Sequence, residues 1–349
     1  MALRVALFLG VAVVSLLLYW QTIDCFFVFD DLSIIRFSWI EGKSWMHCFH
    51  PMSNGFWRPS VFLLARSLIV LFGVTPIVFH LTSILLHTLV CLLTFEVALR
   101  LCGGRRDTAL IAAAMVASHV GAWQCVSQFQ NVCDLLLAVF VLSTLLMWDR
   151  YLRTGRISHL LLVLLLQVGA ITAKETGVIV PVLLTLWLLQ AGKAGRQQNR
   201  ALGVFYALCF AYAFVSMVQQ HATSLSYHST GQVSWNVKNI FRQGTDYVMS
   251  AFLPYLNTIA PPFGPILMPH SIRWALRMAT ACWILWAIWS YVCKPALRSE
   301  VFPVLACAAC VSLPSLLNMQ PHGRMLYSAL PFASIYTARI TATAQPPRR

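Results

Sequence analysis

Two adjacent carboxylates, Asp30 and Asp31, follow the first long apolar stretch of the chain, in the run Phe-Phe-Val-Phe-Asp-Asp. The whole chain has only 11 acidic residues. A charge beside hydrocarbon is costly, and it is kept where it meets a cation, a metal ion or a substrate. The pair is therefore the first candidate for a functional site, although a helix-end cap in a solvated turn would also explain it.

The composition predicts the surroundings of that pair. Hydrophobic residues make up 59% of the chain and charged residues 10%, whereas ordinary soluble domains carry about 25% charged residues. Apolar stretches close to the roughly 20 residues that a membrane-spanning helix needs recur along the whole length. Backbone polar groups in lipid must be satisfied within a helix. We expect an all-α polytopic membrane protein, with one transmembrane domain over residues 1–349 and about 10 to 11 transmembrane helices.

The net charge of +14 is explained by membrane topology. Most basic residues lie in short loops between apolar helices, as the positive-inside rule describes for cytoplasmic loops; they are Arg100, Arg105, Arg106, Arg150, Arg153, Arg156, Lys193, Arg196, Arg200, Lys294, Arg298, Arg348 and Arg349. They do not form the basic face of a groove-binding protein, so nucleic acid is excluded as a partner. The alternating path places on the external side the segments 24–58, 119–134, 174–175, 221–275 and 318–324.

The expected helices position these external segments. The stretch 60–101 holds two helical pieces broken near Gly73 and Pro76, one of which we expect to be re-entrant or interfacial. A piece at 246–260 is broken by Pro254 and is expected to lie at the interface. The remaining helices are expected at 6–20, 108–119, 135–149, 157–173, 177–190, 201–219, 276–293, 301–317 and 325–340.

Several short polar motifs recur beside these helices. They are Phe29-Asp30-Asp31, Trp57-Arg58-Pro59-Ser60, Ser118-His119, Asn131-Val132-Cys133-Asp134, Ala173-Lys174-Glu175-Thr176-Gly177 and His322-Gly323-Arg324-Met325-Leu326-Tyr327. Their order and spacing resemble those of the GT-C class of lipid-linked-sugar glycosyltransferases. The likeness is greatest to the protein O-mannosyltransferases and the membrane part of the transmembrane-and-TPR O-mannosyltransferases, with their bacterial relatives. It runs from about residue 28 to 335.

The chain departs from that family pattern at three points. Val120 stands where relatives have a proline after the histidine, no arginine precedes Asp134, and Gly323 replaces an acid before Arg324.

The resemblance implies an integral-membrane glycosyltransferase. It would move a sugar, with mannose as the first expectation, from a polyprenyl-phosphate donor to a protein or glycan hydroxyl. The reaction would take place on the non-cytoplasmic face of a bacterial inner membrane or an endoplasmic reticulum membrane. Such a transfer needs a base near the acceptor oxygen and positive charge on the departing phosphate.

The same resemblance implies a role for each candidate residue. Asp30 is expected to be the base. Asp31 is expected either to bind a divalent metal ion such as Mg²⁺ or Mn²⁺ or to orient the acceptor. Asp134 and Glu175 are expected to hold the cations in place or to complete a metal site. The phosphate would be bound by Arg58, Lys174 and Arg324, with His119 beside them.

Simpler explanations stay open. Asp134 is also placed to be the N-cap of a helix that begins at Leu135, and Lys174 with Glu175 to form a mutual ion pair at a helix break. His80 and His87 lie on one helical face, where packing and hydrogen bonding between helices is expected.

Two other functions remain. An inactive relative would serve as a lipid-binding or assembly subunit. A transporter is disfavoured, because its site would lie near the bilayer midplane.

Overall fold

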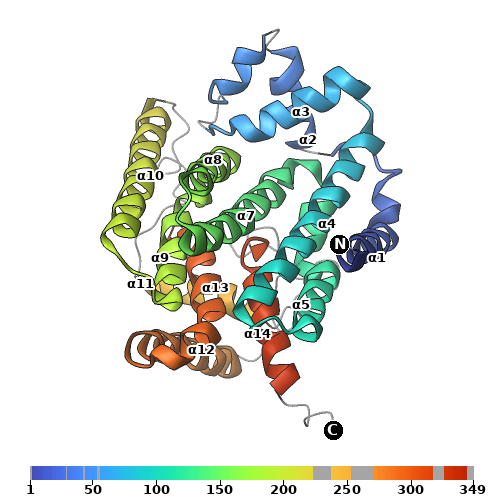
Figure 1. Cartoon of the computed structure of the whole chain (residues 1–349). Helices are drawn as coiled ribbons and strands as arrows, with labels where there is room; N and C mark the ends of the chain where they lie inside the picture. The colour runs from blue at the N-terminus through green and yellow to red at the C-terminus, as the bar shows by residue number, and fades with distance from the viewer. Residues whose placement is uncertain are drawn as a thin grey trace.

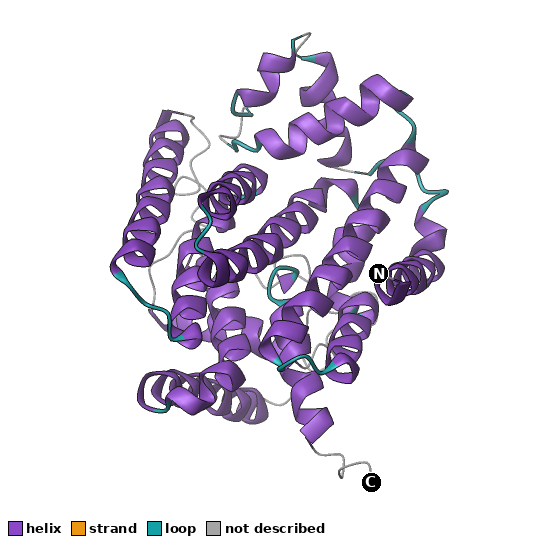
Figure 2. Ribbon diagram, viewed as in Figure 1, coloured by secondary structure: helices purple, strands orange, loops and turns teal. Residues whose placement is uncertain are grey.

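The computed structural model describes residues 2–28, 30–41, 44–52, 56–222, 237–252, 270–316 and 326–343. Every regular element within these ranges is a helix, as Figures 1 and 2 show. This confirms the all-α fold class. The α-helices are α1 (Ala2–Tyr19), α2 (Asp30–Ile35), α3 (Pro59–Phe72), α4 (Pro76–Leu101), α5 (Arg106–Ser118), α6 (Trp123–Ser127), α7 (Val132–Thr154), α8 (Ile157–Ala173), α9 (Val180–Ala191), α10 (Arg196–Ala222), α11 (Val237–Phe252), α12 (His270–Cys293), α13 (Arg298–Leu316) and α14 (Leu330–Thr343).

Short 3-10 and π turns connect them. They are η1 (Trp20–Thr22), η2 (Arg36–Ile40), η3 (Trp45–Phe49), η4 (Val120–Ala122), η5 (Phe129–Asn131), η6 (Glu175–Ile179) and η8 (Pro295–Leu297). The short helices inside the external segments 24–58 and 119–134 were not predicted, because they are too short to carry a hydrophobic period.

The predicted break near Gly73 and Pro76 is confirmed. Gly73 ends α3 with a φ of 70°, a conformation that glycine adopts without strain. Pro76 then starts α4, where its fixed φ suits the first turn of a helix. The 14 residues of α3 span about 21 Å at 1.5 Å per residue, less than the roughly 30 Å of hydrocarbon. Figure 1 shows α3 with α2 at one end of the bundle, which agrees with the expected interfacial piece.

The core is built around α7, which packs along α8 and against α4, while α5 packs between α4 and α14. Its largest fully buried side chains include Trp148 and Tyr151 of α7, Phe205 of α10 and Phe302 of α13. The Trp148 Nε1–H donates to the Leu184 carbonyl at 3.1 Å. A buried indole N–H needs such a partner, so this bond fixes α7 against α9.

The described helices are those of a multi-pass membrane protein. Five of them are long and apolar enough to span a bilayer, and α5 with α6, bent by 51°, makes a sixth if the two pieces form one span. Four shorter apolar helices bring the total among the described residues to ten. One of them is the interfacial α3, so nine of these ten (10 − 1) could cross, close to the expected number. Large apolar side chains stay exposed on α12, among them Leu285, Trp289 and Val292, as a lipid-facing surface requires.

The apolar piece at 246–260, expected at the interface, overlaps the C-terminal part of a longer helix, α11. It begins at Val237 and is described as far as Phe252; the prolines that follow lie outside the described residues. Arg277 Nε and Nη2 of α12 donate to the two oxygens of Asp246 at 2.8 and 2.7 Å. Both side chains are buried. Bidentate geometry of this kind helps to offset the cost of burying two charges, and the pair fixes α11 against α12.

Candidate functional site

The two carboxylates of the acidic pair have different surroundings. Asp30 and Asp31 begin α2, and because consecutive helical residues point about 100° apart, Asp30 is exposed while Asp31 is fully buried. Asp31 Oδ1 accepts the Gln130 backbone N–H at 2.6 Å, and Oδ2 accepts the Val28 N–H at 3.1 Å. Asp31 therefore anchors the start of α2 to the η5 turn, and Asp30 remains accessible.

Burial has a net effect on the ionisation of Asp31. Loss of hydration raises its pKa, the two backbone N–H bonds and the nearby His80 lower it, and the charge of Asp30 raises it. The sum leaves the pKa of Asp31 above its ordinary value of 3.8. A buried carboxyl group with a raised pKa is typical of functional sites.

Arg58 is positioned by the start of α3. It is the N-cap residue, and Pro59 follows at the first helical position. Its Nε and Nη2 donate to the two oxygens of Glu175 at 3.0 and 2.9 Å. Burial opposes the positive charge, but Glu175 outweighs it and raises the pKa of Arg58 above its ordinary value. The side chains of this pair keep 20% and 21% of their surface exposed.

Lys174 and Glu175 lie at the break between α8 and η6. Lys174 is extended, with φ −158° and ψ 146°, so the two neighbouring side chains leave in different directions. The Lys174 Nζ donates to Asp134 Oδ1 at 2.5 Å. These two side chains are only 7% and 4% exposed. The break thus forms one ion pair with α7 and another with the start of α3.

Gly177 makes this tight break possible. A Cβ atom there would lie 2.5 Å from the carbonyl carbon and oxygen of Ala170 in α8. Real Cβ contacts are never this close, so η6 packs against the end of α8 only because residue 177 has no side chain.

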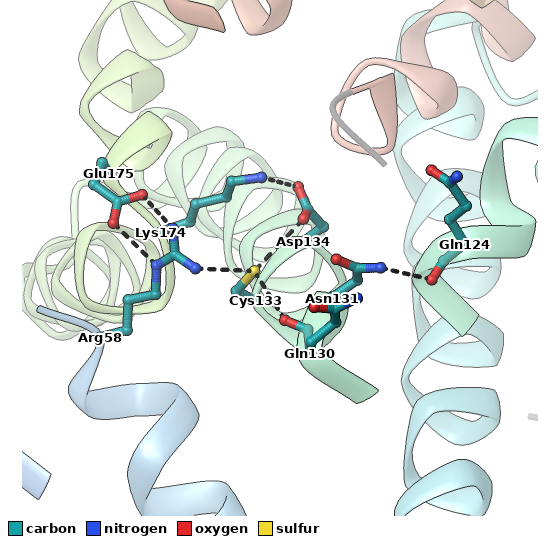
Figure 3. Close-up of polar contacts among 8 residues, drawn as sticks. All are labelled: Arg58, Gln124, Gln130, Asn131, Cys133, Asp134, Lys174 and Glu175. Carbon is teal, nitrogen blue, oxygen red and sulfur yellow. Dashed lines mark hydrogen bonds and ion pairs between the residues drawn. The ribbon is translucent and has the colours of Figure 1, made fainter. Parts of the chain in front are cut away.

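The four charged residues form one cluster, which we call the charged quartet: Arg58, Asp134, Lys174 and Glu175 (Figure 3). Cys133 lies between its two halves. Its Sγ accepts from Arg58 Nη1 at 3.7 Å, and its single S–H has two acceptors within reach, Asp134 Oδ2 at 3.5 Å and the Gln130 carbonyl at 3.7 Å. Because Gln130 also donates its N–H to Asp31, the quartet and the acidic pair are joined through one residue.

Two of the simpler explanations are wrong. Lys174 and Glu175 do not form a mutual ion pair, because each is bound to a different partner. Asp134 is not an N-cap: α7 begins at Val132, with Asn131 before it, and the Asp134 carboxylate is bound to Lys174 and Cys133.

The two remaining predicted phosphate-binding residues are His119 and Arg324. His119 Nδ1 accepts the Gly121 N–H at 2.9 Å and shapes the turn between α5 and α6. Within the described residues it is not hydrogen-bonded to Arg58 or Lys174. Arg324 lies outside the described residues. Both roles stay predictions.

The described residues do not form a metal site. No group of three or more His, Cys, Asp or Glu side chains within them is placed to hold a metal ion. Both oxygens of Asp31 accept backbone N–H groups, and Asp134 is bound to Lys174. A requirement for Mg²⁺ or Mn²⁺ stays a prediction.

Two contributors to the site were missed at the sequence level. Cys133 was passed over although it precedes Asp134, because buried cysteine usually behaves as a small hydrophobe. The main chain of Gln130 leaves no side-chain signature at all. The polarity of the Gln128-to-Asp134 turn was the only available signal.

Comparison with known proteins places this geometry in context. Residues 50–219 match the family described as dolichyl-phosphate-mannose-protein mannosyltransferase. Protein O-mannosyl-transferase Tmtc1 of Drosophila melanogaster is 27% identical over 181 residues, which cover 48% of this chain and 21% of that protein. The chain thus spans about a fifth of the length of that relative.

The family match contains the charged quartet and His119, whereas the acidic pair precedes it and Arg324 follows it. Over residues 50–219 the chain resembles the O-mannosyltransferases of the GT-C class.

Proposed function

We propose that this protein is an integral-membrane glycosyltransferase. It moves a sugar, mannose in the first instance, from a polyprenyl-phosphate donor to a hydroxyl group of a protein or glycan on the non-cytoplasmic face. One observation carries the proposal: three motifs far apart in the sequence converge on the charged quartet, inside the matched residues 50–219, and the quartet is joined through Gln130 to the acidic pair.

Asp30 is the proposed base. It is the exposed member of the pair, so an acceptor hydroxyl can reach it, while the buried Asp31 fixes its position. The acceptor proton passes to the Asp30 carboxylate as the acceptor oxygen forms its bond to the anomeric carbon. The bond from that carbon to the phosphate oxygen breaks at the same time, its electron pair leaves with the phosphate, and the anomeric configuration is inverted.

Arg58 is the proposed partner of the departing phosphate. A guanidinium group has five N–H donors; Glu175 takes two, and the weak acceptor Cys133 takes a third. The pair is partly exposed, so the remaining donors suit a phosphate oxygen. Lys174 is nearly buried against Asp134, so its role is to hold the break after α8 against α7. Arg324 and His119 are the further proposed contacts of the phosphate.

The test is transfer from radiolabelled polyprenyl-phosphate sugars to a mixed pool of peptide and glycan acceptors, by protein purified in detergent. We expect transfer by the wild type and a loss of at least about 100-fold in Asp30→Asn, the usual scale for a positioned base. Asp24→Asn is the matched control, because Asp24 is an exposed acid of the same segment. Equal loss in both variants would remove the assignment of Asp30.

A non-catalytic role is the second candidate, and one observation favours it. Each cation of the quartet is paired with a carboxylate, so its net formal charge is zero and its attraction for an anion is weakened. In that case the purified protein would bind the labelled donor lipid, and neither wild type nor variant would transfer the sugar.

A further inference from the structure

A turn of carboxamide side chains lies between the acidic pair and the charged quartet. Its members are Gln128, Gln130 and Asn131, in and beside η5. On one side, the Gln130 N–H donates to Asp31 at 2.6 Å. On the other side, the Gln130 carbonyl lies 3.7 Å from the Sγ of Cys133, between the two halves of the quartet. The turn therefore connects the proposed base with the proposed partner of the phosphate.

These amide side chains are not helix caps. Gln128 is the N-cap residue of η5 and Asn131 is that of α7, but neither side chain makes a capping hydrogen bond. The amides bond to one another instead. Gln130 Nε2 and Asn131 Nδ2 both donate to Gln128 Oε1, at 3.0 and 3.2 Å. Starting a helix therefore does not explain why three amides are gathered here.

One main-chain carbonyl sets the orientation of all three amides. Asn131 Nδ2 donates to the Gln124 carbonyl at 2.8 Å, as Figure 3 shows, and a carbonyl can only accept. The second N–H of Asn131 then points to Gln128, which must present its oxygen, and this oxygen accepts the Gln130 N–H as well. Gln128 is left with both of its N–H groups for other partners, and Gln130 is left with its Oε1.

The unused polar atoms of the turn have a definite chemistry. Gln128 is half-buried, and its amide N–H groups make no hydrogen bond within the described residues. Gln130 Oε1 and the neighbouring Ser127 Oγ are buried and have no partner there either, although buried polar groups are normally hydrogen-bonded. The set holds both donors and acceptors and carries no charge. It suits hydroxyl groups, which both donate and accept.

We propose that this turn is the sugar subsite of the donor: the Gln128 N–H groups donate to hydroxyl oxygens of the transferred sugar, and Gln130 Oε1 accepts from one of its hydroxyl groups. This assignment rests on the proposed function. In that reaction the anomeric carbon lies between the acceptor oxygen at Asp30 and the departing phosphate at Arg58, and the turn contacts the neighbours of both residues. Neutral amides also add no negative charge that would repel the phosphate.

The test compares two lipids that differ in the sugar alone: mannosyl polyprenyl phosphate and methyl polyprenyl phosphate, a phosphodiester of the same charge without sugar hydroxyls. Equilibrium binding to the full-length protein in detergent gives the ratio of their affinities and needs no transfer. Gln128→Glu is the informative variant, because its carboxylate still accepts from Gln130 and Asn131 but has no N–H to donate. We expect the preference for the mannosyl lipid to fall about tenfold, the effect of one or two lost hydrogen bonds.

Gln124→Glu is the matched control. It makes the same charge change in the same turn, but the amide network uses only the main-chain carbonyl of Gln124, which the substitution keeps. It should change both affinities alike and leave their ratio as in the wild type. An unchanged ratio in Gln128→Glu overturns the subsite. An equal fall in both variants, or a wild type that binds the two lipids equally, overturns it too.

A measurement on the wild type alone covers the case in which Gln128→Glu does not fold. Mannosyl lipids that each lack one hydroxyl group are compared with the complete donor. At least one should bind about tenfold more weakly, and equal binding of all of them overturns the subsite. A sugar preference without transfer supports the subsite and counts against the proposed function. Transfer that is lost in Asp30→Asn, without any sugar preference in binding, does the reverse.

Discussion

The two ion pairs of the charged quartet differ in their access to water. Arg58 and Glu175 keep about a fifth of their side-chain surface exposed, whereas Lys174 and Asp134 are nearly buried. Water screens the first pair, so breaking it is expected to affect binding more than folding. The second pair is buried, and there the loss of one partner leaves an uncompensated charge.

Lys174→Met is therefore expected to lower the free energy of unfolding by about 3–5 kcal/mol, because the Asp134 carboxylate stays buried without its cation. The double variant Lys174→Met/Asp134→Leu should regain most of this loss, since two apolar side chains replace a buried pair at little cost. Denaturant unfolding in mild detergent measures both. A double variant as unstable as the single one would contradict an electrostatic origin.

Asp31 predicts a pH dependence of stability. Its pKa is raised above the ordinary value of 3.8, first of all by burial. The folded state therefore binds this proton more tightly than the unfolded state, and the contribution to stability is present below pH 3.8 and is lost as the pH rises through the folded pKa. Thermal unfolding of wild type against pH should show a decline above pH 3.8 that Asp31→Asn lacks. Parallel curves for the two proteins would be the contrary result.

At the scale of the elements, the sequence predicts breaks better than contacts. Gly73 with Pro76 marked the end of α3 and the start of α4, because these residues act locally on the backbone. The limits of α8 were also predicted correctly. The start of α7 was placed three residues late, at Leu135 instead of Val132, because Asp134 interrupts the apolar pattern of its first turn.

The site residues could be chosen from the sequence, but their partners could not. Arg58 and Glu175 are 117 residues apart, and which carboxylate meets which cation depends on how α3, α7 and α8 pack. No local pattern contains that information. The same holds for Asp31, whose principal anchor is a backbone N–H of a distant turn.

The break at Lys174 makes a prediction about one glycine. Gly177→Ala would bring a Cβ against the Ala170 carbonyl and push η6 away from α8, so we expect a loss of about 1–3 kcal/mol of stability, the usual cost of overpacking. Sugar transfer should also fall, because Lys174 and Glu175 move with η6. Gly203→Ala in α10 is the control, since a Cβ there meets nothing within 4 Å. If the free energy of unfolding changes equally in both variants, the close approach at Gly177 does not contribute to stability.

For the whole molecule, the candidate site and the basic loops lie at opposite ends of the same helices. α7 begins with Asp134 in its first turn and ends with Arg153 in its last turn. Its 23 residues extend about 34 Å at 1.5 Å per residue, slightly more than the roughly 30 Å of hydrocarbon. α4 likewise has His80 near its start and Arg100 in its last turn. The end with the acidic pair is thus separated from the basic end by the thickness of a bilayer.

Because the site and the basic loops lie at opposite ends, the positive-inside rule predicts that the site faces the non-cytoplasmic side, and this can be tested. Cys25, Cys282 and Cys293 are the exposed cysteines of the described residues, so a variant with Cys282→Ser and Cys293→Ser keeps Cys25 as the accessible thiol beside the acidic pair. In sealed vesicles of known orientation, a membrane-impermeant maleimide should label Cys25 from the non-cytoplasmic side. Arg156→Cys, in the same variant with Cys25→Ser, should react only from the cytoplasmic side, because Arg156 lies in a basic loop at the other end. The reverse pattern would place Asp30 in the cytoplasm and exclude transfer on the proposed face.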